Sequence, residues 1–141
     1  MLVKQLSIFL ENKKGRFTEV TTILGEAGIN MSAFTVAENS DFGIVRMLVS
    51  DAEKARNVLR ENKYAVSITD VLCLQMPNEP GALGKIMKII TKADISIEYM
   101  YAFSIGNGAT VVIRPDNLEK TLSVLTENKV ELLASSELFA L

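Results

Sequence analysis

Met76-Pro77-Asn78-Glu79-Pro80-Gly81-Ala82-Leu83 repeats a pattern that first appears 66 residues earlier as Leu10-Glu11-Asn12-Lys13-Lys14-Gly15-Arg16-Phe17. The segments that follow also correspond, because Ala27-Gly28-Ile29-Asn30-Met31 recurs as Ala93-Asp94-Ile95-Ser96-Ile97 at the same offset. Self-similarity at a fixed period indicates a duplicated folding unit. We therefore expect two domains of similar structure, residues 1–69 and residues 70–141.

The hydrophobic pattern of the first repeat predicts alternating strands and helices. Leu6, Ile8 and Leu10 alternate with other residues, which is the period of a strand, whereas Phe17 and Val20 begin a stripe at helical spacing. The elements expected are a strand over 2–10, a helix over 15–27, strands over 29–37 and 42–49, a helix after a capping box at Ser50-Asp51-Ala52-Glu53, and a strand from Val66.

The second repeat predicts the same series. The elements expected are a strand ending at Met76, a helix that ends at Asp94, a hairpin of 95–104 and 109–113 with Asn107-Gly108 at its tip, a helix capped by 116–119, and a strand over 132–141. No Gly or Pro interrupts 66–76, so the last strand of the first repeat should run almost directly into the second repeat. Each half is therefore βαββαβ. We expect an α+β fold of two ferredoxin-like repeats, with antiparallel sheets and helices on one face.

Composition excludes several classes of function. The formal charge is −2, the pI is about 5.2, and Lys and Arg are not clustered, which argues against nucleic-acid binding. Cys73 is the single cysteine and there is no histidine, so we expect a reducing compartment, no metal and no cofactor. No apolar run approaches the roughly 20 residues that span a bilayer, and residues 1–5 do not resemble a signal peptide. We expect a cytoplasmic protein that binds no membrane.

The junction between the first strand and the first helix of each repeat is the expected site of chemistry. Asn12-Lys13-Lys14-Gly15 and Asn78-Glu79-Pro80-Gly81 occupy these junctions. Glycine lets the backbone pass close to another group, and proline presets φ for a helix entrance. The first amides of a helix have no internal partner and can bind a carboxylate. Alternatively, the two asparagines only shape and cap the turn.

The element order, together with Asn-Glu-Pro-Gly-Ala-Leu at 78–83 and Asp-Ile-Ser-Ile at 94–97, resembles the ACT domain. That family is a small regulatory module that binds amino acids, and the resemblance covers the whole chain as two tandem copies. The first repeat keeps Gly15 and Ala27-Gly28-Ile29-Asn30 but has Lys14 where the family commonly has proline.

The resemblance implies a ligand site where two such domains pair side by side into an eight-stranded sheet. The residues implied are Asn12, Lys14, Gly15, Arg16, Phe17, Asn30 and Met31 in the first repeat, and Asn78, Pro80, Gly81, Ala82, Leu83, Ser96 and Ile97 in the second. The amides of Asn30 and Asn78 can meet both an ammonium and a carboxylate. Lys14 is either a charge partner for an acid or a solvated loop lysine. Because Lys14 corresponds to Pro80, we expect one site to bind and the other to be altered or silent.

These observations favour a regulatory module, without catalytic activity, that senses a free amino acid. The alternative is a regulatory subunit that associates with a separate enzyme of amino-acid biosynthesis, as small subunits of acetolactate synthase do within the family. A ferredoxin-like enzyme and an RNA-binding protein are less favoured, because the chain shows no catalytic constellation and is only 6% aromatic. Bare edge strands lead us to expect a homodimer, although two repeats could also complete the sheet within one chain.

Overall fold

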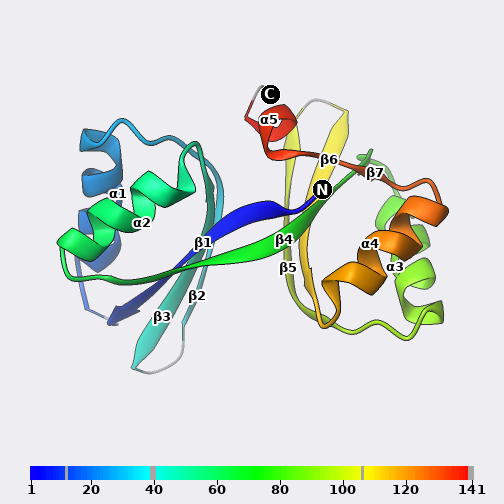
Figure 1. Ribbon diagram of the computed structural model, residues 1–141, viewed down its shortest axis with the longest axis horizontal. Helices are drawn as coiled ribbons and strands as arrows, with labels where there is room; N and C mark the ends of the chain where they lie inside the picture. Colours follow the sequence, from blue (N-terminus) through cyan, green and yellow to red (C-terminus); the bar gives the residue numbers. More distant parts are fainter. Residues whose placement is uncertain (12, 39–40, 106, 140–141) are drawn as a thin grey trace. The chain divides into compact units, whose positions relative to one another are not determined.

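The structure, a computed structural model, describes residues 1–11, 13–38, 41–105 and 107–139 (Figure 1). The chain divides into two compact units. The N-terminal unit contains Lys4–Thr69, and the C-terminal unit contains Asp70–Leu141 together with Met1–Val3. Each unit has the expected ferredoxin-like arrangement of an antiparallel sheet with two helices on one face.

The N-terminal unit is built on a sheet with the strand order β2-β3-β1-β4. Its elements are β1 (Val3–Glu11), α1 (Arg16–Glu26), β2 (Met31–Glu38), β3 (Phe42–Val49), α2 (Ala52–Glu61) and the beginning of β4 (Ala65–Pro77). The alternation along β1 places Leu6, Ile8 and Leu10 on the face covered by the helices, where they pack with Val20 of α1 and Leu59 of α2. The predicted period therefore corresponds to a real core face.

The C-terminal unit repeats this arrangement with β4 as its first strand. Its further elements are α3 (Ala82–Lys92), β5 (Ile97–Ile105), β6 (Gly108–Pro115), α4 (Leu118–Glu127), β7 (Glu131–Leu132) and α5 (Ser135–Leu138). The strand β4 lies between β6 and β7, and β5 forms the other edge. Leu72, Leu74 and Met76 face the helices and pack with Ile86 and Leu125. As expected, β4 is one uninterrupted strand that enters both units.

Each first helix ends with the same left-handed turn. Gly28 after α1 has φ 74° and Asp94 after α3 has φ 58°. The next amide then donates back to the helix, from Ile29 to the carbonyl of Leu24 at 2.9 Å and from Ile95 to that of Ile90 at 3.2 Å. These bonds keep residues 29 and 95 in the helix end, so β2 and β5 begin two residues later than the sequence predicts.

The capping box predicted at Ser50 is wrong in its first residue. Asp51 is the N-cap of α2, and its carboxylate accepts a hydrogen bond from the amide of Lys54 at 3.1 Å. The Ser50 hydroxyl instead accepts from the amide of Asn30 at 3.0 Å and ties β2 to the end of β3. Asn117 caps α4 in the same way, through the amide of Lys120 at 3.0 Å.

The strand predicted over 132–141 is wrong beyond its first residue as far as residue 139, and residues 140 and 141 lie outside the described part of the chain. Glu131–Leu132 pairs with β4, and a four-residue helix, Ser135–Leu138, follows. The Glu137 carboxylate accepts from the amide of Ala134 at 3.3 Å, which stabilises the first turn of that helix. Leu138 is nearly fully buried, so the segment contributes to packing as a helical turn.

Candidate functional site

The two loops that end at Gly15 and Gly81, called the glycine loops below, have nearly the same backbone dihedral angles at these glycines. Gly15 has φ 87° and ψ −5° at the start of α1, and Gly81 has φ 86° and ψ −12° at the start of α3. A Cβ atom at either position would meet nothing within 4 Å, so glycine is needed for its left-handed conformation and not for lack of space. Gly81 is the N-cap residue of α3, and it has no side chain that could accept a hydrogen bond from the first helix amides. The structure therefore does not show the capping by Asn78 that the sequence allowed.

Backbone hydrogen bonds close both loops in the same pattern. The amide of Arg16 donates to the carbonyl of Lys13, and that of Ala82 donates to Glu79, both at 3.3 Å. Asn78 is exposed, and its backbone amide donates a hydrogen bond to the backbone carbonyl of Asn107 at 2.8 Å. Lys14 and Pro80 are also exposed. Asn12 lies outside the described residues.

The predicted strand positions are held by their backbone. Asn30 exchanges two hydrogen bonds with Ser50, and Ser96 exchanges two with Asp116 at the equivalent place in the C-terminal unit. Met31 and Ile97 are half-buried and pack on the cores of their own units. No hydrogen bond among the described residues joins these strand positions to the glycine loop of the same unit. The two predicted sets are therefore not joined by hydrogen bonds within a unit, although residues of both sets pack on the same core.

Two apolar residues recur at equivalent positions of the two units. Phe17 at the start of α1 is half-buried, and its ring centroid is 5.6 Å from that of Phe34 on the edge strand β2. The equivalent residues of the C-terminal unit are Leu83 and Met100. Phe34, Leu83 and Met100 are all exposed, so both units present apolar surface at these positions.

The electrostatics of the two loops differ. In the N-terminal unit the Glu11 carboxylate lies 2.8 Å from the Lys13 ammonium and 3.8 Å from the Arg16 guanidinium. The hydrogen bond and charge of Lys13, followed by the charge of Arg16, lower the pKa of Glu11. The equivalent positions of the C-terminal unit hold Pro77, Glu79 and Ala82, so this cluster has no counterpart there.

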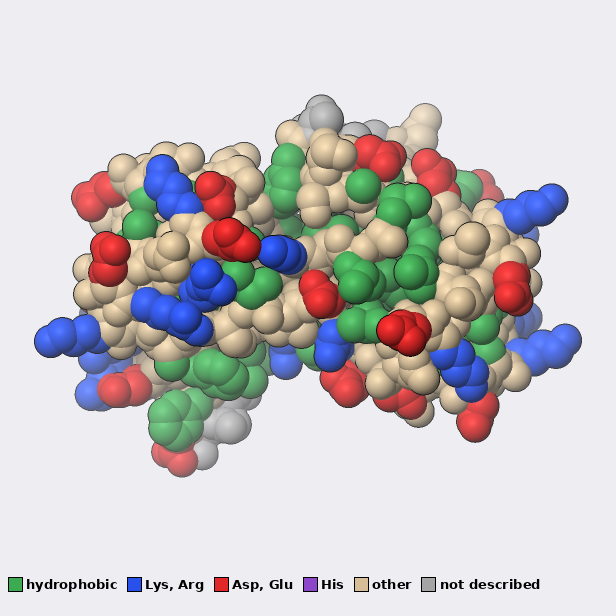
Figure 2. All heavy atoms as spheres, viewed as in Figure 1, with side chains coloured by type: hydrophobic (Ala, Val, Ile, Leu, Met, Phe, Trp, Pro, Cys, Tyr) green, Lys and Arg blue, Asp and Glu red, His purple; other side chains and the backbone are tan. Residues whose placement is uncertain are grey.

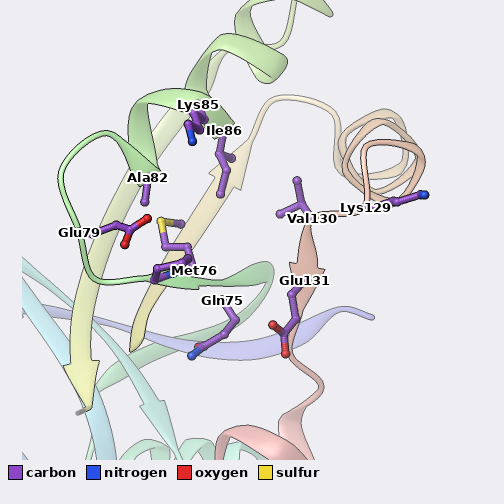
Figure 3. A pocket seen from close by; sticks show the side chains of 10 residues that line it. Gln75, Met76, Glu79, Ala82, Lys85, Ile86, Lys129, Val130 and Glu131 are labelled. Carbon is purple, nitrogen blue, oxygen red and sulfur yellow. The ribbon is translucent and has the colours of Figure 1, made fainter. Parts of the chain in front are cut away.

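The structure shows a hollow at the equivalent place of each unit, beside the first helix, that the sequence did not reveal. The C-terminal hollow has a volume of about 300 Å³ (Figure 3). Its lining residues are Gln75, Met76, Pro77, Glu79, Ala82, Lys85, Ile86, Lys129, Val130 and Glu131. The N-terminal hollow has a volume of about 480 Å³ and is lined by Phe9, Glu11, Arg16, Glu19, Phe42, Asn62, Lys63, Tyr64 and Ala65.

The two hollows occupy equivalent positions of the repeat. Each lies where the end of the first strand, the first turns of the first helix and the start of the last strand meet. Among the predicted site residues that the structure describes, Arg16 and Ala82 line a hollow and the others lie outside the two hollows. The 66-residue offset of the repeats pairs Tyr64 with Val130. This difference between the repeats was the signal in the sequence that could have drawn attention to the hollows.

The part of the chain that the structure describes offers little support for a reactive cysteine, a metal site or a membrane-spanning helix. Cys73 is buried, and its burial raises the pKa of the thiol to about 12, which disfavours the reactive thiolate. The described residues contain no group of three or more His, Cys, Asp or Glu side chains able to hold a metal ion. None of the helices in the described ranges is long and apolar enough to cross a membrane.

Known proteins place this architecture in a family. The sequence matches the model of the ACT domain pair over residues 1–141, and none of the curated proteins matches it. A Bacteroides thetaiotaomicron protein of known crystal structure is 54% identical, with a TM-score of 0.96 over 100% of this chain and 98% of that chain.

Two more distant structures share the fold. They are the regulatory subunits of aspartate kinase from Thermus thermophilus and Thermus flavus, which are 14% and 15% identical with TM-scores of 0.65 and 0.62. The alignments cover 89% and 88% of this chain and 93% and 90% of those chains. Because the family model matches the full length and agrees with the duplicated fold, the chain belongs to the ACT domain pair family.

Proposed function

We propose that this protein is a regulatory module without catalytic activity that senses a free amino acid at a junction between ACT units. The observation that carries the proposal is the pair of glycine loops. Each places a left-handed glycine directly before a helix whose first amides have no side-chain cap. Such amides carry partial positive charge and suit the carboxylate of an amino acid.

The proposed ligand residues are those that the sequence predicts around each loop and at the start of the next strand. Asn78 supports this role because its side chain is exposed beside the uncapped helix. In the N-terminal unit, Lys13, Lys14 and Arg16 give the loop several cations, whereas Glu79 and Pro80 give the C-terminal loop an acid and a neutral residue. We therefore propose that the two sites differ in ligand or in occupancy.

A homodimer would complete the junction. The edge strands β2 and β5 end their strand orders, and each carries exposed apolar side chains, including Phe34, Val36 and Met100. A second copy that pairs along such an edge would satisfy open backbone groups and cover this apolar surface. Light scattering coupled to size exclusion should give the mass of a dimer, and a monomer at micromolar concentration would contradict this.

Titration calorimetry with each of the twenty amino acids tests the proposal. We expect a small subset to bind and to raise the melting temperature, because a ligand that binds only the folded state stabilises it. The variant Asn78→Ala should weaken this binding, and Asn107→Ala serves as a nearby control that leaves the proposed ligand groups in place. If no amino acid binds or raises the melting temperature, the sensing proposal is wrong.

A second candidate is a regulatory subunit that acts on a separate enzyme of amino-acid biosynthesis in the cytoplasm. This chain matches nearly the full length of two regulatory subunits of aspartate kinase, so an ACT pair of this size can be an entire subunit. Purification of the tagged protein from its native cells, followed by mass spectrometry, should identify such an enzyme as a stoichiometric partner. Recovery of the protein alone under mild conditions would favour the stand-alone sensor.

A further inference from the structure

The C-terminal hollow has an apolar floor. Met76 and Ile86 belong to the core cluster yet line the hollow, and the half-buried Ala82 and Val130 complete the surface. Figure 3 shows these four side chains directed toward one another from β4, α3 and the segment that leads into β7. Its volume of about 300 Å³ is at the lower end of the range of about 300–1,000 Å³ for ligand pockets. The space suits a small ligand.

The rim of the same hollow carries both signs of charge. Glu79, Lys85, Lys129 and Glu131 line it, and all four are exposed. None of these groups belongs to a salt bridge among the described residues. A ligand with a carboxylate and an ammonium could therefore pair with the rim without displacing an internal ion pair.

The equivalent hollow of the N-terminal unit is larger, at about 480 Å³, but does not have the same aliphatic floor. Tyr64 takes the place of Val130, and Arg16, within 3.8 Å of the Glu11 carboxylate, takes the place of Ala82. Val20, the counterpart of Ile86, is 0% exposed and does not line the hollow.

Tyr64 itself belongs to this altered surface. Its hydroxyl oxygen is buried. Burial raises the pKa of Tyr64, Glu19 raises it further, and Arg16 opposes both. The N-terminal hollow thus has a large tyrosine side chain where the C-terminal hollow has the smaller, aliphatic Val130.

We propose that the C-terminal hollow binds a small zwitterion with an aliphatic body, such as an aliphatic amino acid, and that the N-terminal hollow, which Tyr64 and Arg16 line in place of Val130 and Ala82, does not bind it. The aliphatic group would cover Met76, Ile86 and Val130, while the charged groups meet the lysines and glutamates of the rim. The choice of this ligand class rests on the proposed amino-acid sensing. The location of the site does not rest on that proposal, because the hollow lies within one unit and not at a junction between units.

An NMR titration with L-leucine and L-methionine tests the assignment. In ¹⁵N–¹H spectra we expect amide shifts at Met76, Ile86 and residues 129–131. Replacing leucine by 4-methylpentanoate, which lacks the ammonium, should weaken binding about 10-fold, the effect of losing about 1.4 kcal/mol of a charged contact. L-aspartate should not shift these amides, because its charged side chain would lie on the apolar floor.

Two variants separate this site from the glycine loops. Val130→Tyr copies the residue that the N-terminal unit accommodates at this position, and it should weaken leucine binding at least about 10-fold. Lys129→Gln changes only an exposed rim charge and should weaken binding about 3-fold without affecting folding, whereas the matched control Lys63→Gln should leave it unchanged.

The position of the shifts decides the outcome. Shifts in the hollow that Val130→Tyr or Lys129→Gln reduces support the proposal. Shifts confined to 78–83 and 96–97, with both variants binding like the parent, overturn it and leave the proposed function intact. Failure of all twenty amino acids to bind overturns both.

Discussion

The N-terminal and C-terminal hollows show how a duplicated scaffold acquires two different surfaces. Their surrounding elements are the same, and the backbone of the adjacent glycine loops agrees to within a few degrees in φ. Equivalent positions nevertheless hold Tyr64 and Val130, or Arg16 and Ala82. Because the surrounding elements are the same, the side chains account for the difference between an aromatic and charged lining and an aliphatic one.

The first helices diverge in charge as well. Glu19 and Glu26 of α1 correspond to Lys85 and Lys92 of α3, so the equivalent faces have opposite signs. Both glutamates and both lysines are exposed, so these replacements have little effect on the core. They change the sign of the charge that each helix face attracts. The duplication therefore conserves the buried pattern and lets the surface specialise.

The largest effect should come from removing the tyrosine side chain that lines the N-terminal hollow. Tyr64→Ala should lower the free energy of unfolding by about 3 kcal/mol, since the residue packs against the core but is only half-buried. Val130→Ala, the matched change, should cost only about 1 kcal/mol. Urea unfolding measures both. Equal losses would show that the two positions do not differ in packing.

A second comparison concerns a buried position on the first strand of each unit. Ser7 accepts a hydrogen bond from the side-chain amide of Gln5 at 3.3 Å, whereas the equivalent residues of the C-terminal unit are Cys73 and Val71. Cys73→Ser would place a hydroxyl where Val71 offers no side-chain donor. We expect a loss of about 1–3 kcal/mol in urea unfolding.

Cys73→Ala is the control for this change, since it removes the sulfur without adding a polar atom. It should leave a small cavity and cost less than Cys73→Ser if the unsatisfied hydroxyl dominates. A serine variant as stable as the parent would mean that its hydroxyl finds a partner at this position.

The glycine loops should respond alike. Gly15→Ala and Gly81→Ala force an alanine into a left-handed conformation, and each should cost about 1–2 kcal/mol. Gly84→Ala is the matched control, because Gly84 lies within α3 with open space around it and should gain about 0.5–1 kcal/mol. Thermal and urea unfolding give both values. A loss at only one loop would show that the two backbones do not carry the same strain.

Most of the fold could be predicted from the sequence because its signals are local. Alternation at Leu6, Ile8 and Leu10 and the glycine at each helix start fix register and boundaries without knowledge of the rest of the chain. The errors arose where local signals compete. Residues 132–141 are apolar enough for a strand, but the Glu137 side chain instead stabilises a helical turn.

The hollows could not be predicted in the same way. Their linings combine residues 75–86 with residues 129–131, or 9–19 with 62–65, and only the packed unit brings these segments together. The repeat alignment did contain the decisive difference, Tyr64 against Val130, but the size of a side chain gains meaning only once its neighbours are known. The proposed ligand residues at the glycine loops stay a prediction.

The smallest expected effect is electrostatic and is confined to the N-terminal loop. Lys13 lowers the pKa of Glu11, so the folded state binds this proton less tightly than the unfolded chain. The stabilisation by this pair is therefore present above the ordinary carboxyl pKa and is lost as pH falls through the lowered value. Lys13→Ala should raise the pKa of Glu11 toward its ordinary value, which a ¹³C NMR titration of the carboxyl group measures.

Lys14→Ala, which removes another exposed loop cation, is the control and should leave that pKa nearly unchanged. Since Pro77 occupies the equivalent position, the C-terminal loop can have no matching titration. An unchanged Glu11 pKa in Lys13→Ala would mean that the charge pair does not distinguish the two loops in solution.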